Sequence, residues 1–232
     1  NGRNESYAVC PDDKDYEQKE FRENAIRYLT RTILTVPWNK LYSISYHKEH
    51  NIKFRNTKLE DHHFNMDILM DVERVSMVSK PFYHYYRSRQ GTDSELVYNQ
   101  FLNQKKRDHI AHTLEVYKHW GIQDANTMGQ LADYHMGRLV QCVMQTVANQ
   151  QITRKEKYQE LQKIIDDPYT EFAKRNALNA SKKIAILSIP IRMKSKKLCY
   201  LMGWGVARFK ENFSGIYYTM RASVAQGASR VE

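Results

Sequence analysis

The sequence has few cysteines: only three occur in 232 residues, and Cys10, Cys142 and Cys199 lie far apart. A small, odd number of widely separated cysteines excludes a dense disulfide framework and indicates a reducing compartment. No stretch reaches the roughly 20 consecutive apolar residues that a membrane-spanning helix needs. Internal repeats and low-complexity segments are also lacking. We therefore expect a cytoplasmic protein of one large or two small domains that does not cross a membrane.

Acidic residues are outnumbered, with 36 Lys and Arg against 26 Asp and Glu, and the formal net charge at pH 7 is +10. Such an excess predicts a polyanionic partner, which is either a membrane surface or a nucleic acid. The basic residues concentrate toward the C-terminus, and zinc-finger, RNA-recognition and clear helix-turn-helix signatures are missing. Nucleic acid is therefore the weaker of the two expectations.

Three short segments carry most of the chemical signal. They are residues 37–42 (PWNKLY), 59–65 (LEDHHFN) and 81–89 (PFYHYYRSR). In their order and approximate spacing, these segments resemble the acceptor half of family 2 glycosyltransferases. In bacterial members of that family, a Trp-Asn-Lys-Leu-Tyr segment precedes a Glu-Asp pair at a helix start, and a Tyr-rich strand ending in Arg-x-Arg follows. The strong part of the resemblance extends over about a quarter of the chain.

The resemblance implies a fold and an activity. The fold would be α/β, a partial GT-A nucleotide-diphospho-sugar transferase fold, followed by an α-helical bundle. The activity would be the inverting transfer of a sugar from a nucleotide-diphosphate donor, uridine-diphosphate linked, to a hydroxyl group of a glycan or lipid-linked acceptor in cell-envelope polysaccharide biosynthesis. The alternative is a non-catalytic, glycosyltransferase-like module that docks on a membrane or a partner enzyme.

The family's donor half and its metal motif are missing from the sequence. The family binds Mg²⁺ or Mn²⁺ through Asp-x-Asp at the end of an apolar strand, because such ions need hard oxygen ligands. The only local acidic cluster, Asp12, Asp13 and Asp15, lies too close to Trp38 to leave room for a donor fold. We interpret it as a loop and helix-start cluster and assign no metal ligand in this chain. Together with a first residue other than Met, this predicts a C-terminal piece of a longer protein, whose other half would hold the metal.

Glu60 and Asp61 are the candidate catalytic residues. They precede Phe64, Ile68 and Leu69, which recur at helical spacing, so both acids are expected in the first turn of a helix. The free amides and the positive end of the helix dipole tend to hold carboxylates there ionised. By resemblance, Asp61 would act as general base on a sugar hydroxyl, with Glu60 orienting it or contacting the acceptor. The alternative is a plain helix-start signal, because acids are favoured in any first turn.

Trp38, Asn39 and Lys40 are the candidate substrate-binding residues of the first segment. Pro37 suits a first helical turn, so the segment predicts the beginning of a short helix. By resemblance, Trp38 would shape the sugar site, and Asn39 and Lys40 could reach a diphosphate or a sugar hydroxyl. An ordinary core tryptophan and a solvated lysine are the alternatives.

Residues 75–86 are β-branched and aromatic enough to predict one strand, bent or interrupted at Pro81. Its end would deliver Arg87 and Arg89, whose planar guanidinium groups match the phosphate oxygens of a leaving diphosphate. His84 would lie near the donor phosphates. The alternatives are plain surface charge for the arginines and a core position for His84.

Four other histidines, His47, His50, His62 and His63, raise the question of a zinc site. The adjacent His62 and His63 point in different directions on a helix, and His47 and His50 have no acid on the same turn. We therefore expect no zinc site.

From residue 99 onward the sequence pattern is helical. Helices are expected over residues 101–120, ended by Gly121; over 126–150; and over 153–166, opened by a Thr153–Glu156 capping box and closed by Pro168. We therefore expect residues 1–98 to form the C-terminal half of a GT-A domain, residues 99–180 a helical bundle, and residues 181–232 a basic amphipathic tail.

In residues 181–221, apolar side chains alternate with lysines and arginines around Trp204. A basic amphipathic segment of this kind suits the surface of an anionic bilayer, where each Lys or Arg contributes about 1 kcal/mol. The pattern predicts a peripheral contact with the inner face of the cell membrane. The alternative is a helical hairpin packed on the enzyme with its basic face in water.

Overall fold

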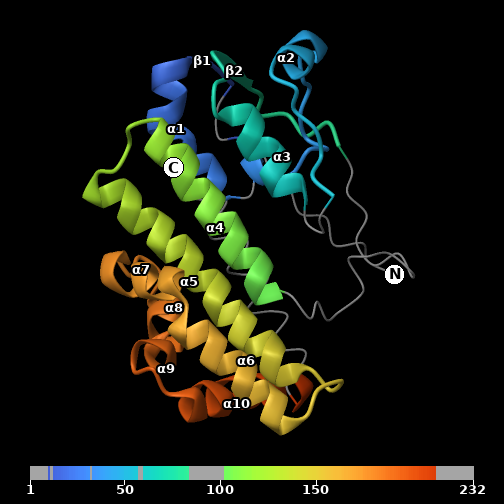
Figure 1. Ribbon diagram of the computed structural model, residues 1–232. Coiled ribbons are helices and arrows are strands. Elements are labelled where there is room, and N and C mark those ends of the chain that lie inside the picture. The colour runs from blue at the N-terminus through green and yellow to red at the C-terminus, as the bar shows by residue number, and fades with distance from the viewer. Residues whose placement is uncertain (1–9, 11–12, 32, 57–59, 84–101, 213–232) are drawn as a thin grey trace. The chain divides into compact units, whose positions relative to one another are not determined.

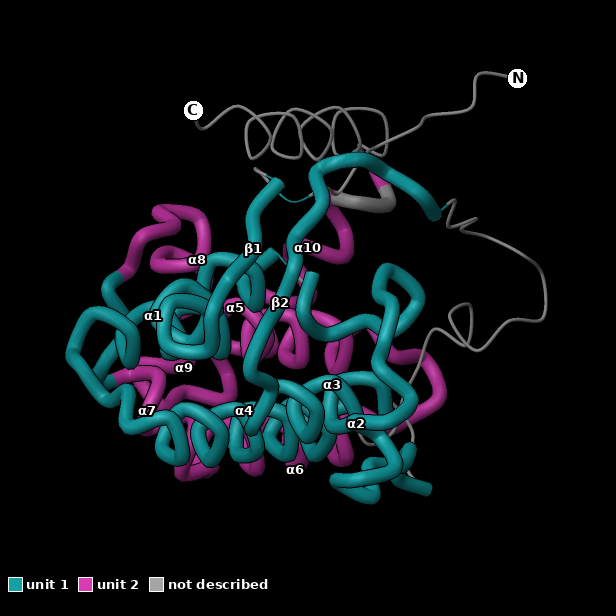
Figure 2. Tube along the Cα trace, turned by 90° about the horizontal axis from the view of Figure 1, so that it is seen from above, with its two compact units in different colours: residues 1–135, 175–178 teal, residues 136–174, 179–232 magenta. Residues whose placement is uncertain are grey.

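The computed structural model is mostly helical, with one two-stranded sheet in the part it describes (Figure 1). It describes residues 10, 13–31, 33–56, 60–83 and 102–212. The chain divides into two compact units: unit 1 is Asn1–His135 with Arg175–Leu178, and unit 2 is Met136–Lys174 with Asn179–Glu232 (Figure 2). The division lies inside helix α5 (Ala125–Ala148), and thus at a different place from the domain boundaries expected after residues 98 and 180.

Unit 1 contains the sheet and the elements that carry the candidate site. In chain order they are β1 (Lys14–Glu17), α1 (Gln18–Leu29), η1 (Ile33–Thr35), α2 (Ile44–Glu49), α3 (Glu60–Leu69), β2 (Arg74–Met77), α4 (Leu102–His119) and the first half of α5. The helix expected over residues 101–120 is confirmed as α4. Gly121 follows it with a φ of 72°, a left-handed conformation that commonly ends a helix.

Strands β1 and β2 pair antiparallel, with Lys14 opposite Met77 and Glu17 opposite Arg74. The four residues of β1 pair with all four of β2, and residues 78–83 are not strand. The strand expected over residues 75–86 is therefore confirmed for residues 75–77 and wrong for residues 78–83, because the ladder ends at Met77, opposite the first residue of β1. A sheet of two strands does not show the GT-A fold expected for residues 1–98.

The core of unit 1 fixes the chain just beyond the end of α3. Phe21, which is fully buried, meets the ring of Trp120 edge to face with 6.2 Å between centroids. The indole N–H of Trp120 donates to the carbonyl oxygen of Met70 at 2.9 Å, and Arg22 Nη2 donates to the same oxygen at 3.0 Å. These donors satisfy a carbonyl group that the end of the helix leaves without an intrahelical partner.

Helix α4 holds α3 through four buried histidines, which we call the histidine cluster: His62, His63, His109 and His112. The ring of His62 stacks on that of His109 at 4.2 Å, and its Nε2 lies 3.0 Å from the hydroxyl oxygen of Thr113. His63 Nδ1 and His112 Nδ1 are 3.0 Å apart, a hydrogen bond in which one ring donates to the other. His62 and His63 thus contact different residues of α4, with their ring planes at 88° to each other.

Unit 2 is built from the second half of α5 and the helices after it. These are α6 (Arg154–Asp166), α7 (Pro168–Asn176), α8 (Lys182–Leu187), α9 (Ile189–Arg192) and α10 (Lys196–Asn212). The capping box of Thr153 and Glu156 is confirmed: the Thr153 hydroxyl accepts from the Glu156 amide, and the Glu156 carboxylate accepts from the Thr153 amide at 2.7 Å. Pro168 does not only close α6; it also provides the first residue of α7.

The described part of the basic tail forms three helices, α8, α9 and α10. Lys194 has a φ of 52° and lies between α9 and α10. Helix α10 packs on α6. A Cβ atom added at Gly203 would lie 2.9 Å from Val147 Cβ in α5, so glycine permits the close approach of α10 to α5. No helix in the described part of the chain combines the length and the apolar character that crossing a membrane requires.

Candidate functional site

The candidate site lies in unit 1, where the loop between η1 and α2 meets the first turn of α3. Tyr42, in this loop, donates its hydroxyl hydrogen to Asn65 Oδ1 at 2.9 Å. Asn65 Nδ2 donates in turn to the carbonyl oxygen of Asp61 at 2.7 Å. These hydrogen bonds fix the loop to the turn of helix that carries Asp61.

Glu60 and Asp61 occupy the first turn of α3, which confirms their expected position. Both residues are half-buried. Burial raises the pKa of Asp61 and the charge of Glu60 raises it further, whereas the charge of Lys40 lowers it. A carboxylate with a raised pKa is a stronger base, so Asp61 is better suited than an exposed acid to accept a proton from a hydroxyl group.

Lys40 forms hydrogen bonds with residues that precede it in the chain. Its ammonium group donates to the carbonyl oxygens of Ile33 and Val36, both at 2.6 Å, and to Asn39 Oδ1 at 2.8 Å. Burial lowers the pKa of Lys40 to about 7, whereas the charge of Asp61 and the three acceptors favour the protonated form. When protonated, Lys40 affects the site through its charge, which lowers the pKa of Asp61.

Asn39 is engaged in the same loop, because its Nδ2 donates to the carbonyl oxygen of Ile33 at 3.1 Å. The helix predicted to begin at Pro37 is wrong: residues 38–39 form a turn, and α2 begins at Ile44 with Ser43 as its N-cap. The contacts of Lys40 with the carbonyl groups before it hold the chain in this turn. A direct contact of Asn39 or Lys40 with substrate stays a prediction.

Trp38 and Tyr83 form an aromatic surface that is open to solvent. Their rings stack with 4.9 Å between centroids and 26° between planes. Trp38 is 38% exposed and Tyr83 is 53% exposed, so Trp38 is not a buried core side chain. A flat, exposed pair of rings can bind the C–H face of a sugar, since aromatic faces pack well against apolar groups.

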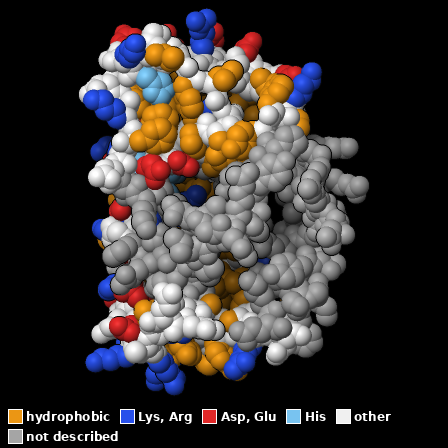
Figure 3. Space-filling model, turned by 90° about the vertical axis from the view of Figure 1, so that its right-hand side faces the viewer, with side chains coloured by type: hydrophobic (Ala, Val, Ile, Leu, Met, Phe, Trp, Pro, Cys, Tyr) orange, Lys and Arg blue, Asp and Glu red, His pale blue; other side chains and the backbone are white. Residues whose placement is uncertain are grey.

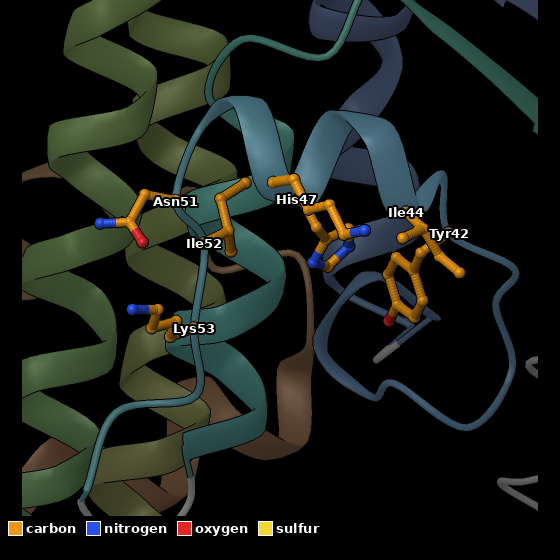
Figure 4. Close-up of a pocket in the computed structure, with 7 residues that line it drawn as sticks. Tyr42, Ile44, His47, Asn51, Ile52 and Lys53 are labelled. Atoms are coloured by element: carbon orange, nitrogen blue, oxygen red, sulfur yellow. The ribbon is translucent and has the colours of Figure 1, made fainter.

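A pocket of about 490 Å³ lies next to Tyr42. It is lined by Tyr42, Ile44, His47, Lys48, Asn51, Ile52 and Lys53. Figure 4 shows the rings of Tyr42 and His47 side by side, and they meet edge to face at 5.4 Å. His47 Nε2 is buried and has no hydrogen-bond partner within the described part of the chain.

Large apolar side chains are exposed in the segments around the site. They are Leu41, Ile44, Phe54, Val78 and Phe82, with Leu41 fully exposed and Phe82 79% exposed. On the side of the molecule shown in Figure 3, hydrophobic side chains gather in the upper half and acidic side chains border them. Exposed apolar surface of this kind commonly marks a place where a ligand or partner binds.

His84, Arg87 and Arg89 lie outside the described residues, so their expected roles stay predictions. Asp13, from the N-terminal acidic cluster, accepts a hydrogen bond from the backbone amide of Ser79 at 2.5 Å and thus joins the chain before β1 to the chain after β2. Within the described ranges, no three His, Cys, Asp or Glu residues are grouped so that they could hold a metal ion.

Sequence reasoning missed the roles of Asn65, Tyr83 and His47. Asn65 could have been found, because it lies four residues after Asp61 and thus on the same face of the helix. No sequence signal pairs Tyr83 with Trp38 or places His47 in a pocket, since both arrangements depend on tertiary packing.

A scan against protein-family models found no match, and searches of curated proteins and of solved structures found no significant match. The function must therefore be argued from the residues and the geometry described above.

Proposed function

We propose that this chain provides the acceptor-binding, base-carrying part of an inverting glycosyltransferase. The enzyme would move a sugar from a nucleotide-diphosphate donor, uridine-diphosphate linked, to a hydroxyl group of a glycan or lipid-linked acceptor in polysaccharide biosynthesis. The observation that carries the proposal is the environment of Asp61, which is half-buried beside Glu60 and influenced by the charge of Lys40. The order of the three sequence segments supports it.

The proposed chemistry is a single displacement. The acceptor oxygen attacks the anomeric carbon of the donor sugar, and the bond from that carbon to the diphosphate oxygen breaks. The hydroxyl proton passes to the Asp61 carboxylate, while the nucleotide diphosphate leaves with the bonding electron pair. Attack opposite the leaving group inverts the anomeric carbon. A positioned base typically contributes about 10²–10⁴-fold to such a rate.

The other residues have supporting roles in this proposal. The Trp38–Tyr83 pair would bind one face of the acceptor sugar, and Glu60 would orient Asp61 or contact the acceptor. His84, Arg87 and Arg89 would face the donor phosphates and the leaving diphosphate. The GT-A fold is part of the proposal, and the divalent ion would be bound mainly by residues of a donor-binding half rather than by this chain. A cytoplasmic location is part of the proposal, because few and widely spaced cysteines are typical of a reducing compartment.

The test is sugar transfer by the native protein as its cell makes it. Membranes and lysate from cells that carry wild type or Asp61→Asn are given radiolabelled nucleotide sugars, and the initial rate of transfer is compared at equal protein level. Asp61→Asn preserves the shape of the side chain and removes the base, so the rate should fall about 10²–10⁴-fold. The matched control is Asp166→Asn, which makes the same change on an exposed carboxylate of α6 and should leave the rate within about twofold of wild type.

Transfer by Asp61→Asn at close to the wild-type rate would show that Asp61 is not the base. A wild-type protein that transfers no sugar from any nucleotide donor would contradict the proposal that the protein is a glycosyltransferase.

The second candidate is a non-catalytic module that docks on a partner enzyme or a membrane. It is favoured by one observation, the exposure of Leu41, Ile44 and Phe82 around the site. A docking module would show no transfer but would bind its partner stably, and Leu41→Ser with Ile44→Ser would abolish that binding. An enzyme would lose transfer with Asp61→Asn and keep any complex intact.

A further inference from the structure

The sequence between Glu171 and Glu211 contains no acidic residue. Within it lie ten basic residues: Lys174, Arg175, Lys182, Lys183, Arg192, Lys194, Lys196, Lys197, Arg208 and Lys210. This stretch includes α8 and α9 and most of α10, all of which belong to unit 2. So one-sided a charge distribution attracts anionic partners.

Not all of these cations face outward. Arg192 is used inside unit 2: its Nη2 donates to Asn179 Oδ1 at 2.6 Å, and its Nε donates to the Ser188 hydroxyl oxygen at 3.1 Å. Lys194 Nζ lies 3.5 Å from Glu171, which partly neutralises it. The fully outward cations of the described stretch include Lys182, Lys183, Lys196 and Lys197, whose residues are all exposed.

Helix α10 presents one buried face and one exposed face. Cys199 and Gly203 are buried and lie four residues apart, which fixes the inner face. Leu201 and Trp204 lie three residues apart on the outer face and are 59% and 50% exposed. Lys197, four residues before Leu201, begins the same outer row, so a cation stands beside the exposed apolar pair.

At the other end of the row, the Arg208 guanidinium carbon lies 5.8 Å from the centroid of the Trp204 ring. The outer row of α10 therefore reads Lys197, Leu201, Trp204 and Arg208, with cations at both ends. Further exposed apolar side chains lie next to this row, in α8 and α9, and directly after α9. They are Ile186, Ile189, Met193, Leu198 and Phe209.

We propose that the outer row of α10, with the lysines at 182, 183 and 196, binds peripherally to bilayers that contain anionic lipids. The proposal goes beyond the sugar-transfer function and does not depend on it. Exposed aliphatic side chains beside an exposed tryptophan suit the boundary between headgroups and acyl chains, while the lysines extend to the lipid phosphates. A nucleic acid would attract the same cations but would leave the isoleucines and leucines in water, so the bilayer fits the surface better.

The experiment is co-sedimentation of the purified chain with sucrose-loaded vesicles. One set contains phosphatidylcholine alone, and the other contains phosphatidylcholine with phosphatidylglycerol at about seven to three. We expect binding to the anionic vesicles that weakens as salt is raised, with a blue shift of Trp204 fluorescence in a Trp38→Phe, Trp120→Phe background.

Two variants separate the charged from the apolar contribution. Leu201→Ser with Trp204→Ser should weaken the partition coefficient at least about tenfold, because it removes the inserted apolar groups. Lys196→Glu with Lys197→Glu should weaken it at least about 25-fold, since each lysine contributes about fivefold. The matched control is Lys118→Glu with Lys155→Glu, which makes the same charge change at exposed lysines of α4 and α6 and should change the partition coefficient far less. A circular dichroism spectrum of each variant checks that the helices form.

Equal binding to neutral and anionic vesicles would overturn the proposal, as would wild-type binding by the Leu201→Ser, Trp204→Ser variant. Displacement of the chain from vesicles into a complex with a single-stranded RNA oligonucleotide at equal charge concentration would show a nucleic-acid surface instead. Failure of the chain to bind anionic vesicles at low salt would also contradict the membrane-binding proposal.

Discussion

In unit 1 the charged side chains around α3 are partly buried and act on one another. In unit 2, by contrast, Lys182, Lys183, Lys196 and Lys197 are exposed in a stretch without acids. Lys40 has three hydrogen-bond acceptors and a pKa lowered by burial, and Asp61 has a raised pKa. Lys196 and Lys197 are exposed to solvent. Perturbed titratable groups suit proton transfer, and exposed like charges suit attraction to a surface. The two units therefore differ in the kind of function that their charges can support.

The largest difference between the two units is expected when an apolar side chain is substituted in each. Phe21→Ala should lower the free energy of unfolding of unit 1 by about 3–5 kcal/mol, because Phe21 is fully buried between the rings of Tyr16 and Trp120. Leu201→Ala on the exposed row of α10 should change it by only about 0.5 kcal/mol. Urea unfolding followed by circular dichroism measures both. Equal losses would show that the outer face of α10 is covered in solution.

A smaller effect is expected when a lysine is replaced by methionine in each region. Lys40→Met leaves the carbonyl oxygens of Ile33 and Val36 without their donor, so unit 1 should lose about 2 kcal/mol. The loss of the cation should also raise the pKa of Asp61 further, which a carbon NMR titration of its carboxyl group measures. Lys197→Met is the matched control on an exposed lysine. If both variants were equally stable, the contacts of Lys40 would not hold the loop.

The smallest effect is expected from pH, and it should appear in unit 1 alone. Burial lowers the pKa of His63, as does the charge of Arg55; burial also lowers the pKa of His112, although the charge of Asp67 opposes this. The unfolded state then binds more protons than the folded state below about pH 6.5, the ordinary histidine value. The free energy of unfolding should have its full value above that pH. It should fall as the pH is lowered from there through the depressed pKa values of His63 and His112 in the folded state.

Unit 2 contains no histidine, so its resonances should not share this loss. Thermal unfolding followed by nitrogen-resolved NMR at pH 7.5 and pH 5.5 separates the units, and His63→Gln with His112→Gln should flatten the response of unit 1. A parallel loss in both units would mean that other groups titrate.

The sequence predicts the elements whose signals are local. The capping box of Thr153 and Glu156, the stop at Gly121 and the helix start at Glu60 all depend on residues within one turn of the feature, and all three are confirmed. The position of Asp61 in the first turn of α3 could be predicted for the same reason.

Features that depend on distant partners could not be predicted in this way. The turn at Trp38 is set by the hydrogen bonds of Lys40, and the end of β2 is set by the length of β1. The histidine cluster joins α3 to residues 47 or more positions further along the chain, so neither helix shows it alone. The pocket beside Tyr42 likewise arises from packing, because no motif marks its lining.

The proposed function requires that Asp61 and the Trp38–Tyr83 ring pair belong to one sugar-binding site. The most direct measurement is an NMR titration of the chain with short oligosaccharides of glucose, galactose and N-acetylglucosamine, and with octyl glycosides as mimics of a lipid-linked acceptor. We predict that a single ligand shifts the Asp61 carboxyl carbon and the Trp38 indole resonance with the same dissociation constant, and that Trp38→Ala weakens binding at both. Sugars that shift neither resonance, or that shift the two with unrelated dissociation constants, would contradict the claim.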